Sequence, residues 1–420
     1  MKSFLQFLSL LFLAPAMLLA QPVVSTMGKS ILVNDSAYII RGVCYQPVAI
    51  GDNRFDPLDF SHIDQDIQLM TDAKINTIRT YVPITNASVL DKFAAAGIMI
   101  IIGFPNYDDT FQYPDINHGT YLDYINTYKN HAAILMWELG NEYNYHPEWF
   151  SNNINNWYTI LNNAAGSIHA ADPNHPVSTA HGEVPASVAL TMCPNIDVWG
   201  MNVYRWDNPA AAITSFAAMS TKPCYFSESG GDRYNINQGA ENQQHQANAD
   251  VTIWNHIKAK FDLCSGITFF SFVDEWWKKG SASAHDATGF SNSVPYDSYA
   301  NEEWWGIVDI YRNPTLAYYA LQNVFTDYWN GIDDLSMDSQ AWIFPNPAGS
   351  NATIRMAKPL NEEIVLEIHS LTGSILYSER MQINGTDIVI PLQKWQHLPG
   401  ACFVSVRSKF TNYNDLLLLQ

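Results

Sequence analysis

Eight short runs of apolar residues, separated by longer stretches, most constrain the fold of this 420-residue chain. Within each run the apolar residues are continuous rather than alternating, which is typical of strands buried on both faces of a parallel sheet. The runs are Tyr38–Tyr45, Ile75–Val82, Ile98–Phe104, Ile134–Leu139, Pro176–Thr179, Ile196–Val203, Pro223–Phe226 and Ile267–Val273. Eight strand–helix units predict an α/β fold, the closed (β/α)8 TIM barrel. An open doubly wound sheet is the alternative, but no glycine-rich phosphate loop follows the first run.

The chain changes character near residue 330. Before that point, four stretches between the runs have helical spacing: Ser61–Ala73, Asn86–Ala96, Asn152–Ala171 and Asn242–Phe261. Beyond it, short alternating segments predict a small all-β sandwich. These segments are Ala352–Met356, Glu363–His369, Ser374–Ser378, Asp387–Pro391 and Cys402–Arg407. We expect a barrel domain at residues 21–329, a linker at 330–343 and a β-sandwich domain at 344–420.

The first twenty residues have the pattern of a secretory signal peptide. Lys2 is the only early charge, Phe4–Leu13 is apolar, and Ala16 and Ala20 suit a cleavage site. A retained membrane anchor is the alternative, but the apolar stretch is short for a span. We therefore expect an exported, monomeric mature protein without a membrane span.

Composition narrows the function. The 22 basic and 41 acidic residues give a net charge of −19, which disfavours nucleic acid, anionic membranes and polyanionic substrates. The five cysteines lack a CxxC spacing, so we expect no metal site, and no motif calls for a cofactor. The 13 Trp, 22 Tyr and 20 Phe either pack the core or stack on flat ligands such as sugar rings.

Two carboxylates, Glu142 and Glu228, directly follow the fourth and seventh runs. The carboxyl ends of barrel strands meet at one face, where the working groups of such barrels lie. Glycoside cleavage needs such a pair: one carboxylic acid protonates the leaving oxygen, and one carboxylate attacks the anomeric carbon or directs water to it. The alternative for each residue is a helix cap or a solvated loop carboxylate.

Five further residues at strand ends suit a sugar site. Asn141 is placed to bind a 2-hydroxyl, and Arg79 and Tyr204 are of the types that keep Glu228 ionised. Trp276 is expected to form a floor under the sugar, and His181 to contact the substrate. Ordinary ion pairing, rim packing and a loop histidine are the alternatives.

The segments Trp137–Glu142 and Lys222–Gly230 resemble the retaining glycoside hydrolases of clan A, and the likeness covers about residues 28–325. In that clan an Asn–Glu pair closes strand four and a Glu closes strand seven. The resemblance implies that Glu142 is the acid/base and Glu228 the nucleophile. It also matches Arg79, Tyr204 and Trp276 to the clan's arginine, tyrosine and tryptophan on strands two, six and eight.

Within the clan, Pro83–Phe104 and Pro223–Gly230 are similar to β-1,3-glucanases and to cell-wall glucanosyltransferases. The resemblance implies a secreted, retaining endo-β-glycosidase acting on a neutral β-glucan, most consistent with β-1,3 linkages. A β-mannanase, a β-galactanase, a glucanosyltransferase and a non-catalytic carbohydrate-binding barrel stay open as alternatives.

Three segments of the tail, Phe344–Ala348, Ser370–Gly373 and Leu398–Phe403, resemble the type A C-terminal sorting domain of the Bacteroidota type IX secretion system. The resemblance implies that this secretion machinery is a partner. It also implies export across the outer membrane, followed by release or attachment at the cell surface. A β-sandwich that binds sugar or stabilises the barrel is the alternative.

Overall fold

The computed structural model describes residues 21–110, 112–205, 208–329, 341–344, 348–349, 351–370, 375–390, 392, 401–407 and 412–418. It divides into two compact units, Met1–Gln322 and Asn323–Gln420, and the division lies inside helix α8 (Leu316–Trp329). The expected signal peptide and most of the expected linker lie outside the described residues. Among the helices that are described, none is long and apolar enough to cross a membrane.

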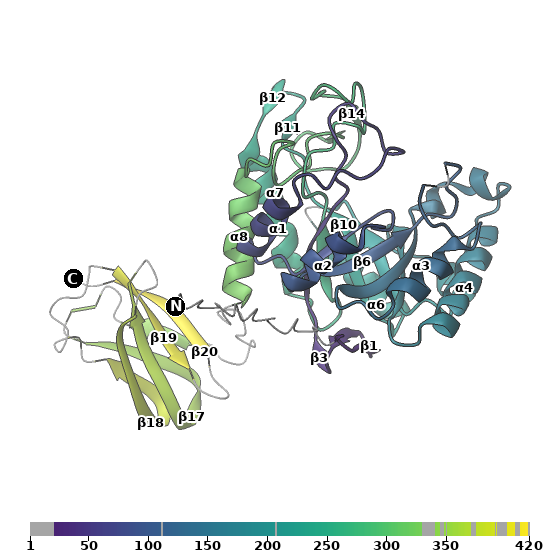
Figure 1. Ribbon diagram of the computed structural model, residues 1–420. Helices are drawn as coiled ribbons and strands as arrows, with labels where there is room; N and C mark the ends of the chain where they lie inside the picture. Colours follow the sequence, from purple (N-terminus) through teal and green to yellow (C-terminus); the bar gives the residue numbers. More distant parts are fainter. Residues whose placement is uncertain are drawn as a thin grey trace, which may run out of the picture. The chain divides into compact units, whose positions relative to one another are not determined.

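The first unit is a closed barrel of eight parallel strands, as the apolar runs predict (Figure 1). Seven strands follow each other around the barrel in chain order, and the eighth closes it against the first, with Ile40 opposite Gly266. The strands are β4 (Ile40–Cys44), β5 (Thr77–Arg79), β6 (Met99–Phe104), β7 (Ile134–Asn141), β8 (Val177–Gly182), β9 (Val198–Asn202), β10 (Cys224–Ser229) and β13 (Gly266–Phe269). Each coincides with one predicted run.

Helices cover the outside of the barrel. They are α1 (Ile63–Asp72), α2 (Ala87–Ala95), α3 (Thr120–Tyr128), α4 (Ile154–Ala171), α5 (Ser187–Met192), α6 (Pro209–Met219), α7 (Gln243–Lys258) and α8. The four predicted helical stretches are confirmed as α1, α2, α4 and α7. The Asn86, Asn153 and Asn242 side chains accept hydrogen bonds from the first-turn amides of three of them.

The amino-terminal end of the barrel is closed by apolar packing. The sheet of β1 (Val24–Met27), β2 (Ser30–Val33) and β3 (Ser36–Ala37) places Val24 and Ile31 in one buried cluster with strand residues such as Ile40 and Met99. The carboxyl ends of the strands therefore remain for the site. Two small hairpins, β11–β12 (Tyr234–Asn235, Ala240–Glu241) and β14–β15 (Gly289–Ser291, Tyr299–Asn301), follow β10 and β13.

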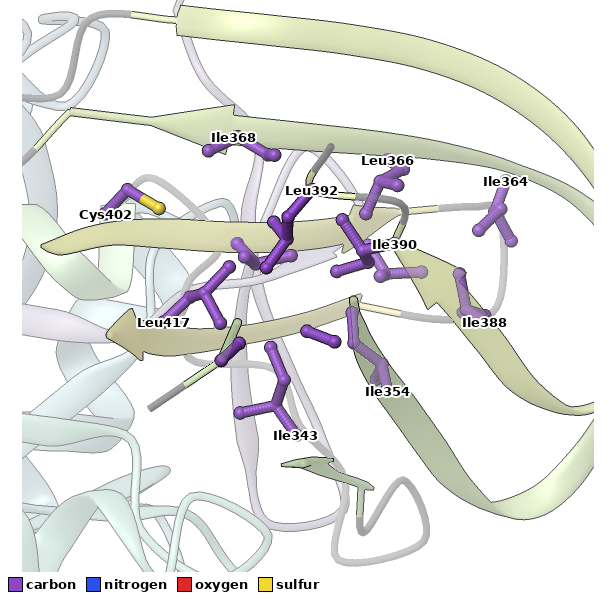
Figure 2. Close-up of a cluster of buried hydrophobic side chains, with 14 of the residues drawn as sticks. Ile343, Ile354, Ile364, Leu366, Ile368, Ile388, Ile390, Leu392, Cys402 and Leu417 are labelled. Carbon is purple, nitrogen blue, oxygen red and sulfur yellow. The ribbon is translucent and has the colours of Figure 1, made fainter. Parts of the chain in front are cut away.

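The second unit is antiparallel. It contains β16 (Ala341–Phe344), β17 (Ala352–His369), β18 (Ile375–Ile390), β19 (Ala401–Arg407) and β20 (Asn412–Leu418). The four short segments predicted between residues 352 and 391 are in fact two long strands, β17 and β18, paired along their length with a register shift between Arg355 and Leu360. Because of this irregularity, the single strand β17 contains both predicted segments, Ala352–Met356 and Glu363–His369. Ile354, Leu366 and Ile390 belong to the buried core of the second unit (Figure 2). Parts of the three tail segments lie outside the described residues.

A buried ion pair ties the first helix to the segment that precedes the last one. Arg312 Nε lies 2.9 Å from Asp66 Oδ1, and the Tyr45 hydroxyl donates to Asp66 Oδ2 over 2.7 Å. Asp66 is fully buried and Arg312 nearly so. Loss of one partner of such a pair leaves an uncompensated charge inside the protein.

Replacing Arg312 with Met should therefore lower the free energy of unfolding of the barrel unit by about 3–5 kcal/mol. Lys92→Met is the matched control, because the Lys92–Asp64 pair also involves α1 but is exposed, and should cost at most about 1 kcal/mol. Urea unfolding followed by helical circular dichroism measures both. Equal losses in the two variants would contradict the argument.

Candidate active site

The carboxyl ends of three barrel strands meet at the guanidinium of Arg79, which ends β5. Its Nε donates to Glu138 Oε1 over 2.5 Å, Nη1 to Glu228 Oε1 over 2.9 Å, and Nη2 to Asn141 Oδ1 over 2.7 Å. Glu138 and Asn141 belong to β7 and Glu228 to β10. Arg79 is fully buried, so this cation depends on the two carboxylates for compensation.

Glu228 is surrounded by hydrogen-bond donors. Besides Arg79, the hydroxyl of Tyr81 donates to Oε1 over 2.8 Å, and the hydroxyl of Tyr204 donates to Oε2 over 3.0 Å. Burial, followed by nearby negative charge, raises the pKa of both tyrosines well above 10, so they stay protonated donors. These three contacts hold the Glu228 carboxylate in one orientation at the barrel mouth.

Glu142 is placed differently, at the first position after β7. Its backbone is left-handed, with φ of 56°, directly after a strand that also turns at Gly140 with φ of 71°. Burial, and then repulsion by Glu228, raise the pKa of Glu142 to about 7. The raised pKa suits Glu142 to the part of the acid, which must still carry its proton when it meets the leaving oxygen.

A cleft of about 980 Å³ opens beside Glu142. Glu142, Asn141 and Tyr81 line it together with loop residues that follow β4, β6, β7 and β13. Its walls carry aromatic side chains that are more than half exposed: Phe55 at 51%, Tyr107 at 54% and Trp149 at 59%. Exposed rings in a hollow are suited to stack on the apolar faces of sugars.

The structure brings five of the seven residues singled out from the sequence together: Glu142, Glu228, Arg79, Asn141 and Tyr204. Asn141 Oδ1 accepts from Arg79 and, over 3.2 Å, from Asn202 Nδ2. This leaves the Asn141 amide NH2 group as a donor toward a ligand.

The other two residues, His181 and Trp276, are held elsewhere. Of the seven, Glu142 and Asn141 line the cleft as it is described. His181 lies buried in β8, where Nδ1 is 2.8 Å from the Gly182 carbonyl oxygen and Nε2 is 3.3 Å from the Tyr158 hydroxyl. Both ring nitrogens therefore have protein partners, so this arrangement gives no support to the expected substrate contact. Trp276 stacks on His285 at 5.2 Å, and the next residue, Trp277, lines the cleft instead.

Sequence reasoning missed four residues of the site: Tyr81, Glu275, Trp277 and Lys278. Tyr81 could have been predicted from the sequence, because it lies two positions after Arg79 at the same strand end. The other three lie in the loop after β13, which has no regular periodicity. Within the described parts of the chain, no cluster of His, Cys, Asp and Glu could hold a metal, and the five cysteines are buried free thiols.

No family model matches this chain, and no curated protein matches it. Solved structures do. A GH2 β-galacturonidase from Eisenbergiella tayi aligns with a TM-score of 0.51 at 19% identity, over 73% of this chain and 54% of that one. β-Glucuronidase 2 from Bacteroides uniformis aligns with a TM-score of 0.54 at 15% identity, over 94% of this chain and 47% of that one. A Bifidobacterium dentium β-glucuronidase aligns with a TM-score of 0.54 at 18% identity, over 73% of this chain and 49% of that one. This chain spans about half the length of these structures, and the likeness establishes the fold.

The raised pKa of Glu142 predicts a pH-dependent stability. Between about pH 4.5 and 7 an unfolded Glu142 releases its proton while the folded one keeps it, so stability falls as the pH rises through this window. Glu142→Gln removes this contribution. When the pH is raised from 5 to 7, the free energy of unfolding should fall in the wild type and the variant alike, but the fall in the variant should be smaller by about 2–3 kcal/mol. Urea unfolding at both pH values measures it.

The control for this prediction is Glu183→Gln. Glu183 also follows a barrel strand, but it pairs with Arg205 at 2.6 Å and is partly exposed. This variant should keep the wild-type pH dependence. The same dependence in all three proteins would mean that Glu142 ionises as an ordinary glutamate.

Proposed function

We propose that this protein is a retaining β-glycosidase. One observation carries the proposal: Glu142 and Glu228 meet at one barrel mouth, where Glu228 receives three donors, whereas burial and repulsion favour the protonated form of Glu142. A retaining glycosidase needs a carboxylate nucleophile and a carboxylic acid at the same bond. The similar solved structures are of proteins named as β-glycosidases, which supports this reading.

The reaction then has two steps. Glu228 attacks the anomeric carbon, the glycosidic bond breaks, and Glu142 gives its proton to the departing oxygen. In the second step Glu142 takes a proton from water, the water oxygen attacks the anomeric carbon, and Glu228 leaves as a carboxylate. Tyr204 and Tyr81 position Glu228 throughout, and the Asn141 amide donates to the 2-hydroxyl. No metal or organic cofactor takes part.

The substrate we propose is a polymer, a neutral β-glucan with β-1,3 linkages, cleaved at internal bonds. A cleft of about 980 Å³ with exposed Phe55, Tyr107 and Trp149 supports binding of several sugar units. The net charge of −19 disfavours a polyanion, and the resemblance of Pro83–Phe104 and Pro223–Gly230 supports the β-1,3 linkage. The similar solved structures carry the names of a galacturonidase and glucuronidases, so uronides belong in the test.

We further propose that the protein is exported. The apolar segment Phe4–Leu13 and the small residues after it support a signal peptide. The tail resembles a type IX sorting domain, and its described strands form an antiparallel unit separate in sequence from the barrel. In this proposal the secretion machinery recognises residues 344–420, and the barrel acts on a polymer outside the cell.

Incubation of the wild type with β-1,3-glucan, β-1,4-glucan, mannan, galactan and a polyuronide, followed by analysis of the released oligosaccharides, tests the function. Wild type should act on β-1,3-glucan, and Glu228→Ala should reduce release by roughly a thousandfold or more, because the nucleophile is gone. Glu183→Gln, which changes a strand-end glutamate outside the pair, should keep wild-type activity.

Each alternative has its own outcome in this assay. Release from mannan or galactan alone would keep the mechanism and change the sugar. Products longer than the starting oligosaccharide would identify a transferase. No release from any polymer by the wild type would contradict a glycosidase and favour a non-catalytic binding barrel.

A further inference from the structure

The loop that follows β13 presents three polar residues to the cleft: Glu275, Trp277 and Lys278. Glu275 is only 3% exposed, yet its Oε2 has no hydrogen-bond partner among the residues that the structure describes. The indole Nε1 of Trp277 is also buried and unpartnered there. Buried polar atoms are normally hydrogen-bonded, so unpartnered atoms on residues that line a cleft have hydrogen bonds to offer a ligand.

Lys278 sits between two carboxylates. Its Nζ lies 3.6 Å from Glu275 Oε2 and 3.9 Å from Glu302 Oε2, and 4.2 Å above the ring of Phe270. The ammonium compensates Glu275 without forming a short hydrogen bond to it. Glu275 Oε2 therefore stays available as an acceptor, while the positive charge of Lys278 is already balanced.

Arg79, the other buried cation of the site, is also paired, since it forms salt bridges with Glu138 and Glu228. A uronic acid carboxylate placed beside Glu275 would meet that carboxylate, while the buried cations Arg79 and Lys278 are already paired; Arg54, which also lines the cleft, is exposed to solvent. A neutral sugar would instead offer hydroxyl donors to Glu275 and acceptors to Trp277 and Lys278. The charges thus favour neutral sugars over uronic acids.

We propose that Glu275, supported by Lys278, binds hydroxyl groups of the sugar in the cleft and selects neutral glycans over uronic acid glycans. This inference rests on the proposed glycosidase function and deepens it. Glu275 is a substrate-binding residue in this proposal, distinct from the reacting pair Glu142 and Glu228. Burial raises the pKa of Glu275 to about 7, so this group is partly ionised at neutral pH. A hydroxyl bound to its charged form contributes more than one bound to a neutral group.

The test compares two forms of the polymer that the wild type cleaves: the neutral form, and the same polymer after selective oxidation of its C6 hydroxymethyl groups to carboxylates. Wild type should prefer the neutral form. Glu275→Gln should lower kcat/KM on that form by roughly 10–100-fold, chiefly through KM. The ratio of neutral to oxidised activity should also fall, because a negative charge is removed from the cleft.

Glu302→Gln is the matched control. It removes the other carboxylate near Lys278, but Glu302 does not line the cleft as described. Its kcat/KM and its preference should stay within about threefold of wild type. Thermal melting of both variants checks that a loss of activity does not arise from unfolding.

Three results would overturn the inference. Equal losses in Glu275→Gln and Glu302→Gln would assign the effect to the charge balance of Lys278 rather than to a hydroxyl contact. Unchanged kinetics and preference in Glu275→Gln would remove Glu275 from substrate binding. Wild-type preference for the oxidised polymer would reject neutral selection. In all three cases the glycosidase itself would stand, whereas no wild-type turnover of any polymer would reject both proposals.

Discussion

The site depends on one buried cation. Arg79 contacts Glu138 and Asn141 on β7 and Glu228 on β10, so one guanidinium joins three barrel strands at their carboxyl ends. A buried charge is costly unless it is paired and hydrogen-bonded. Glu228 compensates the charge of Arg79, and the same contact orients the Glu228 carboxylate. Stability of the barrel mouth and chemistry of the site are therefore coupled.

The asymmetry between the two glutamates follows from this arrangement. Glu228 receives the guanidinium and two tyrosine hydroxyls, whereas Glu142 is buried beside that negative charge and its pKa rises to about 7. Position on the barrel alone would not separate them, since both lie at the carboxyl ends of parallel strands, Glu142 just after β7 and Glu228 near the end of β10. Three partners of Glu228 make the difference: Arg79, which ends β5, Tyr81, two residues further along, and Tyr204, two residues after β9.

The sequence predicts well the features that the barrel strands determine. The eight runs, and the strand-end residues Arg79, Asn141, Glu142 and Glu228, follow from continuous apolar segments and from the convergence of parallel strands. Loop residues were less predictable. Trp276 and Trp277 are neighbours, and only the path of the loop after β13 decides which one lines the cleft. In the tail, strands predicted as separate run on through a register irregularity, which apolar alternation does not reveal.

The central claim is that Glu228 forms a covalent bond to the sugar, and the stereochemistry of the first product tests it most directly. Proton NMR of the anomeric signals, recorded during the first minutes of cleavage, distinguishes the two mechanisms before mutarotation mixes the anomers. Two displacements predict that the β-anomer appears first and the α-anomer only later. Initial appearance of the α-anomer would show a single displacement by water and would contradict the assignment of Glu228 as nucleophile.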